Sequence, residues 1–166
     1  MAVFTKLEEE EIKNFISIYN IGNLDKYDEI VDGIENTNYK IICNGKKYIL
    51  TIFEKRVDEE DLPFFIDLKL YLSANNFKCP EPIKNKAGGI INTLKDKKAI
   101  IISFIEGSKI NIPTSKQCEE VGKMLGDLHN LTANFKQKRE NSLGIDEWKK
   151  LFSKCENNQE KKFDEL

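Results

Sequence analysis

The sequence is poor in histidine and has no clustered cysteines. It contains one histidine, His129, and four widely spaced cysteines that form no C-x-x-C pair. A zinc site takes its ligands from clustered cysteines and histidines, so this composition argues against one. It also offers no Ser-His-Asp arrangement. His129 follows Leu128 in an amphipathic run, and we interpret it as a structural histidine rather than a catalytic base.

The chain also lacks an excess of charge and any long apolar run. Its 166 residues include 26 basic and 28 acidic side chains. A nucleic-acid partner usually requires a strong basic excess. A membrane span requires about 18 consecutive apolar residues, and a signal peptide requires an apolar segment that the acidic N-terminus lacks. We therefore expect a cytoplasmic protein with free thiols and with neither a membrane nor a nucleic-acid partner.

Common motifs of nucleotide and acyl chemistry are missing as well. The sequence has no G-x-x-x-x-G-K-[ST] loop, no G-x-G-x-x-G fingerprint and no G-x-S-x-G elbow. What it has is enough apolar residues, 40% of the total, to build a core in a chain of this length. The length suits one domain or two small ones.

The first third of the chain predicts a helix followed by strands. Apolar residues recur at helical spacing over about residues 8–19, after a possible capping box of Thr5 and Glu8. Strand patterns follow at 38–43 and 47–54, with a weaker candidate at 24–32. The pair Asn44-Gly45 is typical of a two-residue hairpin turn, because both positions tolerate positive φ.

A second helix and a second hairpin are expected next. The acidic run at 58–61 and Pro63 favour a helix N-terminus, and the helix runs to about Asn75. Its apolar face is expected to contain Phe64, Phe65, Leu68 and Leu72. Residues 90–94 and 98–105 form a hairpin pattern around Lys95-Asp96-Lys97. The continuous run AIIISFI in the second strand is typical of a strand that is buried on both faces.

The last third of the chain is predicted to be helical. Thr114 and Gln117 are spaced as a capping box before an amphipathic helix that reaches Leu131. A highly charged helix is expected over residues 145–166. Together the elements predict an α+β fold, with a five-stranded antiparallel sheet and one inserted helix. The composition changes near Gly107, which predicts a sheet-rich lobe over 1–107 and a helical lobe over 108–166.

This order of elements is that of the small lobe of a kinase-like phosphotransferase. The last strand would lead into a connector beside the adenine ring, so backbone groups of the segment Ser103, Phe104, Ile105 and Glu106 would bind adenine. The loop between the first two strands would cover the phosphates with Gly33, Asn36, Thr37 and Asn38. The same residue types also form ordinary Asx and ST turns.

Seven segments in order carry a more specific resemblance. They are GIENTNY (33–39), YILTIFEKRV (48–57), EEDLPFF (59–65), CPEPI (79–83), SFIEG (103–107), VGKMLGDLH (121–129) and KRENSLG (138–144). Together they resemble the N-terminal half of bacterial homoserine kinase of the aminoglycoside-phosphotransferase-like type. The resemblance implies a kinase-like small lobe followed by the first helices of a large lobe. It also implies transfer of the γ-phosphoryl group of ATP, with Mg²⁺, to the hydroxyl of L-homoserine in threonine biosynthesis.

Two departures from the kinase-like pattern stand out. The third strand should carry a cation for the phosphates, but alternation places Ile49 and the neutral Thr51 on the relevant face. Both are expected at the nucleotide site. Lys55 and Arg56 could supply the charge instead, or could be solvated charges at the strand end.

The second departure is that no H-x-D-x-x-x-x-N catalytic loop is present. We therefore expect no catalytic residue and no metal ligand in this chain, and an inactive N-terminal half. Two alternatives stay open. The acceptor could be another small alcohol or an aminoglycoside, or the chain could be a non-catalytic nucleotide-lobe binding module. The oligomeric state is open as well.

Overall fold

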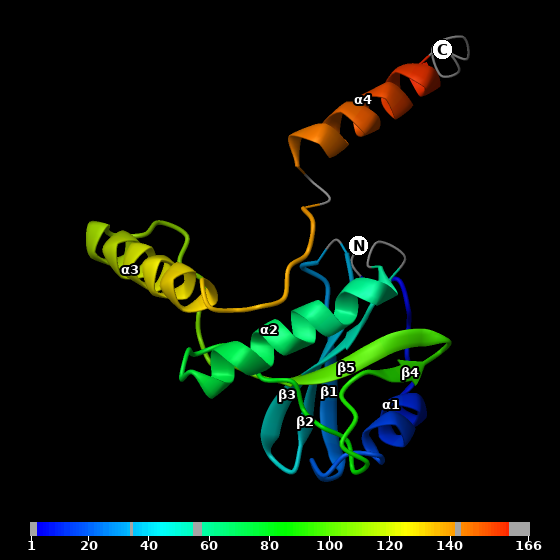
Figure 1. Ribbon diagram of the computed structural model, residues 1–166. Helices are drawn as coiled ribbons and strands as arrows, with labels where there is room; N and C mark the ends of the chain where they lie inside the picture. Colours follow the sequence, from blue (N-terminus) through cyan, green and yellow to red (C-terminus); the bar gives the residue numbers. More distant parts are fainter. Residues whose placement is uncertain (1–2, 34, 55–57, 142–143, 160–166) are drawn as a thin grey trace. The chain divides into compact units, whose positions relative to one another are not determined.

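The computed structural model of the chain divides into two compact units, residues 1–136 and 137–166 (Figure 1). It describes residues 3–33, 35–54, 58–141 and 144–159. Lys55 and Arg56, the two substitute cations, lie outside these residues. The end of the expected last helix, residues 160–166, also lies outside them.

The first unit contains one antiparallel sheet. Its strands are β1 (Leu24–Ile30), β2 (Thr37–Cys43), β3 (Lys46–Ile52), β4 (Asn92–Leu94) and β5 (Lys97–Ser103), in the order β1-β2-β3-β5-β4. All four neighbouring pairs are antiparallel. The predicted α+β class with a five-stranded antiparallel sheet is therefore confirmed.

Both hairpin turns use consecutive residues with positive φ. Asn44 and Gly45 have φ of 46° and 73°, which confirms the predicted turn between β2 and β3. In the second hairpin the turn residues are Lys95 and Asp96, with φ of 49° and 59°. Lys97 already pairs with Leu94 in the ladder, so its predicted place in the turn was wrong by one residue.

The first helix, α1 (Glu9–Ile16), is shorter than predicted and has a different cap. Its capping box consists of Glu8 and Glu11, so the predicted box of Thr5 and Glu8 is wrong. Thr5 instead donates its side-chain hydrogen bond to Glu54, at 2.7 Å. A partner 49 residues away thus replaces the local one.

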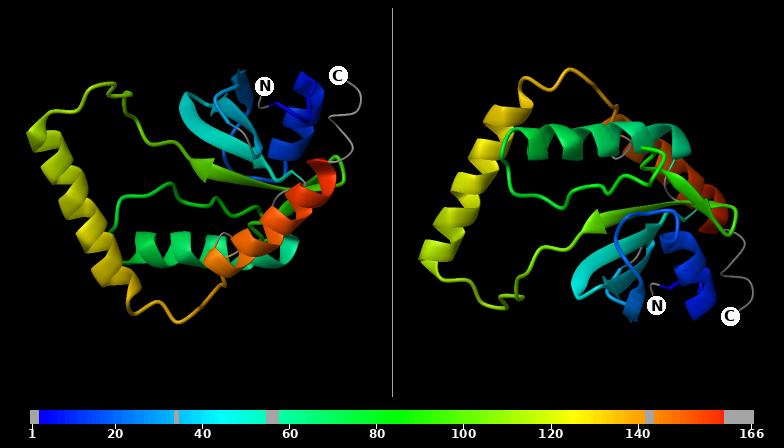
Figure 2. Two further views of the ribbon diagram at one scale, coloured as in Figure 1. Left: turned by 90° about the horizontal axis from the view of Figure 1, so that it is seen from above. Right: turned by 90° about the horizontal axis from the view of Figure 1, so that it is seen from below.

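The main core lies between α1 and one face of the sheet (Figure 2). Alternate residues of three strands are buried there: Tyr39, Ile41, Cys43, Leu50, Ile52, Ala99 and Ile101. Cys43 is a free thiol, as expected, and it is fully buried. Because neighbouring strand residues point to opposite faces, the intervening residues of β2, β3 and β5 are directed away from α1.

The second helix, α2 (Leu62–Ala74), lies on the other side of the sheet (Figure 2). It follows a short 3₁₀ turn, η1 (Glu59–Asp61), whose preceding residue Asp58 accepts a hydrogen bond from Glu60 N–H at 3.1 Å. Leu62, Ile66 and Leu72 are its buried residues, whereas Phe65 is exposed. The predicted apolar face was therefore wrong for Phe65. The helix is apolar nearly all round, so its sequence alone does not select one face.

The third helix, α3 (Ser115–Thr132), begins with the predicted capping box of Thr114 and Gln117. Its C-terminal end is attached to α2. The Tyr71 hydroxyl donates to the carbonyl oxygen of Leu131 at 3.1 Å, and the ring of Phe135 lies against those of Phe64 and Tyr71. The side chain of His129 is exposed on this helix rather than packed inside it.

The second unit contains α4 (Ile145–Gln159), and the N–H groups of Glu147 and Trp148 in its first turn donate to the carbonyl oxygen of Gly144. Four apolar side chains of this helix are exposed: Ile145, Trp148, Leu151 and Phe152. None of the helices in the described ranges combines the length and the apolar character that a membrane crossing requires.

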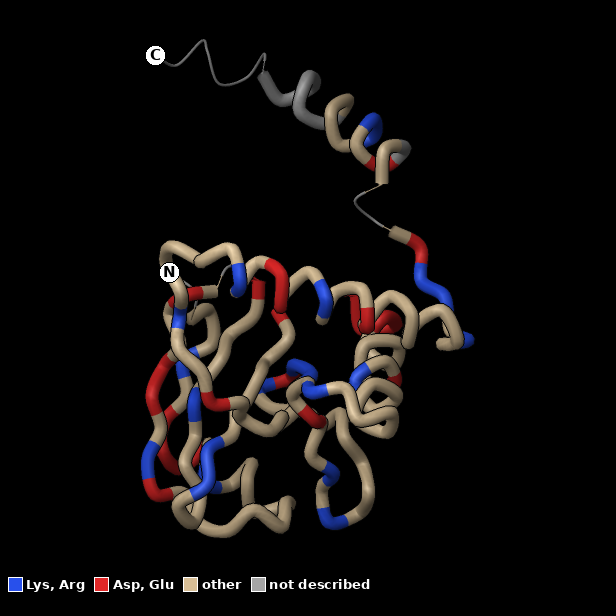
Figure 3. Tube along the Cα trace, turned by 90° about the vertical axis from the view of Figure 1, so that its left-hand side faces the viewer, with Lys and Arg blue, Asp and Glu red and all other residues tan. Residues whose placement is uncertain are grey.

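Residues of both charge signs are interspersed along the described chain (Figure 3). On β1 and β2, for example, Asp28 pairs with Lys26 at 3.0 Å and with Lys40 at 3.2 Å. Hydrogen bonds from these two lysines lower the pKa of the Asp28 carboxyl. Such exposed pairs contribute little to stability, but they keep the outer edge of the sheet polar.

Candidate functional site

A cavity of about 350 Å³ lies between the second face of the sheet and α2. It is lined by Glu35, Asn36, Asn38, Thr51, Phe53, Phe65, Ile66, Lys69, Ile100 and Ile102. Three residues that the sequence placed at the nucleotide site are thus brought together, namely Asn36, Asn38 and Thr51. The cavity lining combines apolar side chains with amide, hydroxyl and charged groups, which is typical of a small-molecule site.

A chain of side-chain hydrogen bonds connects the sheet to the loop between β1 and β2. Thr51 lies directly opposite Asn38 in the ladder, and its hydroxyl donates to Asn38 Oδ1 at 2.8 Å. Asn38 Nδ2 donates to the carbonyl oxygen of Asn36 at 3.3 Å. Asn36 Oδ1 in turn accepts from the N–H of Glu54 at 3.4 Å. The end of the loop is therefore held at the cavity by its own polar side chains.

Thr37 is not part of the cavity, although it was predicted at the same site. It is fully buried on the α1 face, where its hydroxyl donates to Glu54 Oε1 at 2.7 Å. Its oxygen also accepts from the N–H groups of Phe4 and Thr5. Strand alternation could have separated Thr37 from Asn38, because adjacent residues of a strand point to opposite faces. Gly33 lies in the loop, outside the described lining.

Glu54 is the centre of a polar cluster that sequence reasoning missed. Its side chain is 9% exposed, and it accepts from Thr5, Thr37 and Lys97. Burial raises the pKa of its carboxyl, but the hydrogen bonds from these three residues outweigh burial and leave the pKa below 4.5. The cluster holds the N-terminal segment against the ends of β2 and β3. No local pattern indicates it, because its members are far apart in sequence.

The predicted connector is attached to the rest of the sheet at both of its ends. Ser103 N–H donates to Glu81 O at 2.8 Å, and Ser103 Oγ accepts from Glu81 N–H at 2.9 Å. At the other end, Lys47 Nζ lies 2.6 Å from Glu106 Oε1 and 5.5 Å from the centre of the Phe104 ring. The Ser103 N–H is therefore already engaged within the protein.

The remaining connector residues are more open. Within the described ranges, no backbone hydrogen bond engages Phe104, Ile105 or Glu106. Nearby, Ile49 of β3 lies opposite Ile102 of β5 in the ladder. Ile102 lines the cavity, whereas Ile49 is half-buried outside its described lining. The arrangement offers apolar surface next to free backbone donors and acceptors, which is what a planar heterocycle requires.

Seven of the ten lining residues were not predicted, although strand and helix patterns indicate some of them. Ile100 lies opposite Thr51 in the ladder, so alternation places it and Ile102 on the same face. Phe65, Ile66 and Lys69 share one helical face by their spacing. That this face of α2 covers the sheet is a tertiary fact that neither pattern contains.

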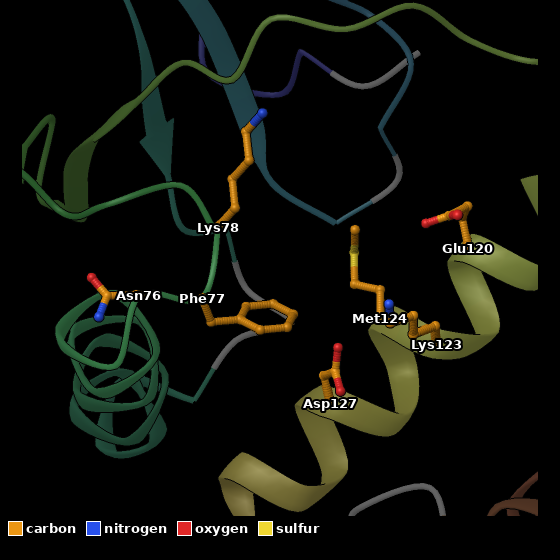
Figure 4. A pocket seen from close by; sticks show the side chains of 7 residues that line it. All are labelled: Asn76, Phe77, Lys78, Glu120, Lys123, Met124 and Asp127. Carbon is orange, nitrogen blue, oxygen red and sulfur yellow. The ribbon is translucent and has the colours of Figure 1, made fainter.

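A second cavity, of about 260 Å³, lies between the end of α2 and α3 (Figure 4). Its lining combines the segment Asn76–Lys78 with residues one and two turns apart on α3: Glu120, Lys123, Met124 and Asp127. Figure 4 shows the side chains of Phe77 and Met124 directed toward each other across this space. Its mixture of charges points to no single ligand.

Metal ligands are not gathered at either cavity. In the part of the chain that the structure describes, no three His, Cys, Asp or Glu side chains are placed to hold one ion together. We therefore assign no residue of the described ranges to a metal.

The chain matches one protein family over most of its length. Residues 26–166 match the model of a family described as the phosphotransferase enzyme family. The chain is 41% identical over 156 residues to a homoserine kinase of Methylobacterium nodulans, covering 94% of this chain and 49% of that relative. It is equally identical to a homoserine kinase of Agrobacterium fabrum, covering 94% of this chain and 48% of that relative. The chain thus spans about half the length of these curated relatives.

Solved structures share the fold at low sequence identity. A spectinomycin phosphotransferase, solved in complex with ADP and spectinomycin, superposes with a TM-score of 0.70 at 16% identity. The match covers 92% of this chain and 47% of that one. A microcompartment-associated aminopropanol kinase has a TM-score of 0.57 at 15% identity, covering 84% of this chain and 48% of that one.

Proposed function

We propose, on the premise that the chain belongs to the phosphotransferase enzyme family, that it is the nucleotide-binding half of an ATP-dependent kinase of L-homoserine. The observation that carries the proposal is the cavity beneath the loop between β1 and β2, next to the connector after β5. The identity to two homoserine kinases, about 40% over nearly the whole chain, supports homoserine over other acceptors. The fold alone would not select one.

The residues around the cavity suit the parts of ATP. The free backbone groups of Phe104, Ile105 and Glu106 would bind the adenine edge, with Ile49 and Ile102 as apolar neighbours. Asn36 and Asn38 would donate to phosphate oxygens from the loop, with Gly33 giving it room. Thr51 fixes Asn38, and Thr37 anchors the start of β2 on the other face of the sheet. This assignment divides the molecule near Gly107, into a nucleotide lobe of residues 1–107 and the start of a substrate lobe over 108–166.

The reaction itself needs groups that these residues do not include. The hydroxyl oxygen of homoserine would attack the γ-phosphorus in line, the bond to the bridging β–γ oxygen would break, and ADP would leave. The hydroxyl proton must pass to a base, and the Asp of an H-x-D-x-x-x-x-N loop is missing from the 166 residues. Mg²⁺ would enter with ATP and neutralise its phosphates. This chain would therefore bind and orient the nucleotide.

Nucleotide binding is the direct test. We expect the purified chain to bind MgATP and ADP in titration calorimetry, and to form no phosphohomoserine when supplied with both substrates. A folded chain without nucleotide affinity would contradict the proposal and favour a binding module of another kind. Phosphohomoserine formation by the 166 residues would show that the catalytic base lies within them.

The acceptor is tested in a chimera. The chain is joined to the C-terminal half of the Methylobacterium nodulans relative, and phosphorylation of L-homoserine, spectinomycin and 1-amino-2-propanol is compared. We expect turnover of homoserine alone. A folded chimera that binds ATP but phosphorylates none of the three would contradict the assignment of this chain as the matching half of a homoserine kinase.

A further inference from the structure

The cavity lacks a cation on the strand where phosphoryl-transfer enzymes of this architecture carry one. Thr51 occupies the corresponding place on β3, and its hydroxyl proton is already donated to Asn38. A phosphate chain in a partly closed site needs positive charge from the protein as well as from the metal. Lys55 and Arg56 lie outside the described residues, so the structure gives them no position relative to the cavity.

One lysine does line the cavity, from the opposite wall. Lys69 belongs to α2, and its helical spacing from Phe65 and Ile66 places all three at the same cavity. Among the described lining residues it is the single Lys or Arg. Lys69 lines the cavity from α2, whereas Asn38 and Thr51 line it from the sheet. A cation there would therefore meet a ligand whose other side contacts the loop amides.

Unlike three other lysines of this lobe, Lys69 has no acidic partner among the described residues. Lys47, Lys97 and Lys98 each pair with a carboxylate. In the described part of the chain, no carboxylate lies within ion-pair distance of the Lys69 ammonium. The one acidic residue in the described lining is Glu35, which is exposed and also makes no ion pair there. A partly buried lysine without an acidic partner among the described residues suits an anionic ligand.

We propose that Lys69 is the phosphate-binding cation of this cavity, with Nζ contacting the polyphosphate of the bound nucleotide in place of a β3 lysine. The inference rests on the proposed function, since the cavity must hold a nucleotide for Lys69 to meet its phosphates. The inference makes a prediction about phosphate contacts that nucleotide binding alone does not test. The contribution of Lys69 must depend on the phosphates and not on the nucleoside.

Amine footprinting tests the contact directly on the intact chain. Lysines are acylated with acetic anhydride in the absence of ligand, with MgATP, with MgADP and with adenosine, and each site is quantified by peptide mass spectrometry. We expect MgATP and MgADP to slow acylation of Lys69, whereas adenosine leaves it unchanged. Lys84, which is exposed and outside the cavity, should react equally in all samples. Protection of Lys55 with none at Lys69 would overturn the inference.

Substitution supplies the second readout. For Lys69→Met we expect affinity for MgATP and MgADP to fall about 10-fold or more, as loss of a charge-assisted phosphate contact implies, while adenosine affinity changes less than about 2-fold. Lys69→Arg should retain most of the phosphate affinity, and Lys84→Met should match the wild type. Urea unfolding of each variant checks that the fold is intact.

The outcomes separate the two proposals. Suppose that the wild type binds MgATP, and that Lys69→Met either lowers the affinities for ATP and adenosine equally or changes neither affinity. The proposed role of Lys69 is then wrong, while the nucleotide site stands. If the folded wild type binds neither ATP nor ADP, the proposed function fails and the inference fails with it.

Discussion

The hydroxyl of Thr51 donates a hydrogen bond to the amide oxygen of Asn38, 2.8 Å away, across a directly opposed pair of β2 and β3. Thr51 is 8% exposed and its partner is half-buried, so water competes little for this bond. The bond joins the centre of the sheet to the first residues after the loop. The neutral side chain of Thr51 therefore stabilises the position of Asn38 at the cavity.

The stability lost on removal of the Thr51 hydroxyl should depend on whether the Asn38 side chain is present. Thr51→Val keeps the shape of the side chain and leaves Asn38 Oδ1 without its donor, so we expect a loss of about 1 kcal/mol in the free energy of unfolding. Thr51→Val, Asn38→Ala and the double variant form a cycle in urea denaturation. A coupling energy of about 1 kcal/mol is expected, and additive effects would contradict the bond.

Glu54 should make stability depend on pH on the acid side. Its pKa in the folded chain is below 4.5, so folding favours the ionised form. The stabilisation is complete well above pH 4.5 and is lost as pH falls through the folded-state pKa. Glu54→Gln should cost about 1–2 kcal/mol at pH 7, because it weakens the bond from Lys97. Urea unfolding at pH 7, 5, 4 and 3 should show the gap between wild type and variant narrowing as pH falls.

The wild type must be compared with the variant, because other carboxyl groups also titrate in this pH range. Glu11 and Asp28 have lowered pKa values, but both proteins contain them, so their effect cancels in the difference. Glu119→Gln, at an exposed position of α3, serves as the matched control and should change stability by less than about 0.5 kcal/mol. A gap that stays constant from pH 7 to 3 would contradict the role of Glu54.

Alanine substitutions at Gly22 and Gly88 can be compared to measure the stability cost of a close side-chain contact. Their φ values are +90° and +87°, so an alanine at either position is strained to a similar degree, by about 1–2 kcal/mol. At Gly22 the new Cβ would also lie 2.3 Å from Asn44 Cγ, whereas at Gly88 nothing lies within 4 Å. Asn44 cannot move freely, because its Oδ1 accepts from Asn23 N–H at 3.0 Å.

We therefore expect Gly22→Ala to lose more stability than Gly88→Ala, by about 1–2 kcal/mol in urea denaturation. The difference isolates the contact with Asn44, since the backbone strain is shared. Equal losses would show that the turn relaxes without breaking the bond to Asn23.

Cys43 and Cys118 should differ strongly in reactivity. Burial, with a smaller contribution from Asp25, raises the pKa of the Cys43 thiol from 9.0 to about 11, whereas Cys118 is exposed. At pH 8 that shift alone lowers the thiolate fraction about 100-fold. We expect iodoacetamide to alkylate Cys118 in the native chain and Cys43 only in urea, as peptide mass spectrometry would show. Rapid native alkylation of Cys43 would indicate that the sheet opens locally.

Local chemistry made much of the fold predictable. The Asn44-Gly45 turn and the capping box of Thr114 and Gln117 depend on residues within three positions of each other, and both were predicted correctly. Strand alternation also holds across β2, β3 and β5. The capping box at Thr5 failed for the opposite reason. The Thr5 hydroxyl donates to Glu54 instead, and this bond forms only when the N-terminal segment lies beside the strand ends.

The candidate site was predictable in part. Asn36, Asn38 and Thr51 were named from the loop and strand pattern, and the structure brings them to one cavity. Thr37 lies outside the cavity lining, because adjacent residues of a strand point to opposite faces and Asn38 takes the cavity side. Lys69 was not considered, since α2 is apolar nearly all round and its sequence does not say which side covers the sheet.

The sequence by itself determined the secondary structure, the antiparallel sheet and the family to which the chain belongs. These follow from periodicity, from turn and cap residues, and from ordered segments that need no knowledge of distant contacts. Only the tertiary structure decided which side chains share the cavity and which carboxylate holds the N-terminal segment. Such pairings depend on how α2 and the N-terminus pack on the two faces of the sheet. That packing is set by non-directional apolar burial summed over many residues, which no local pattern records.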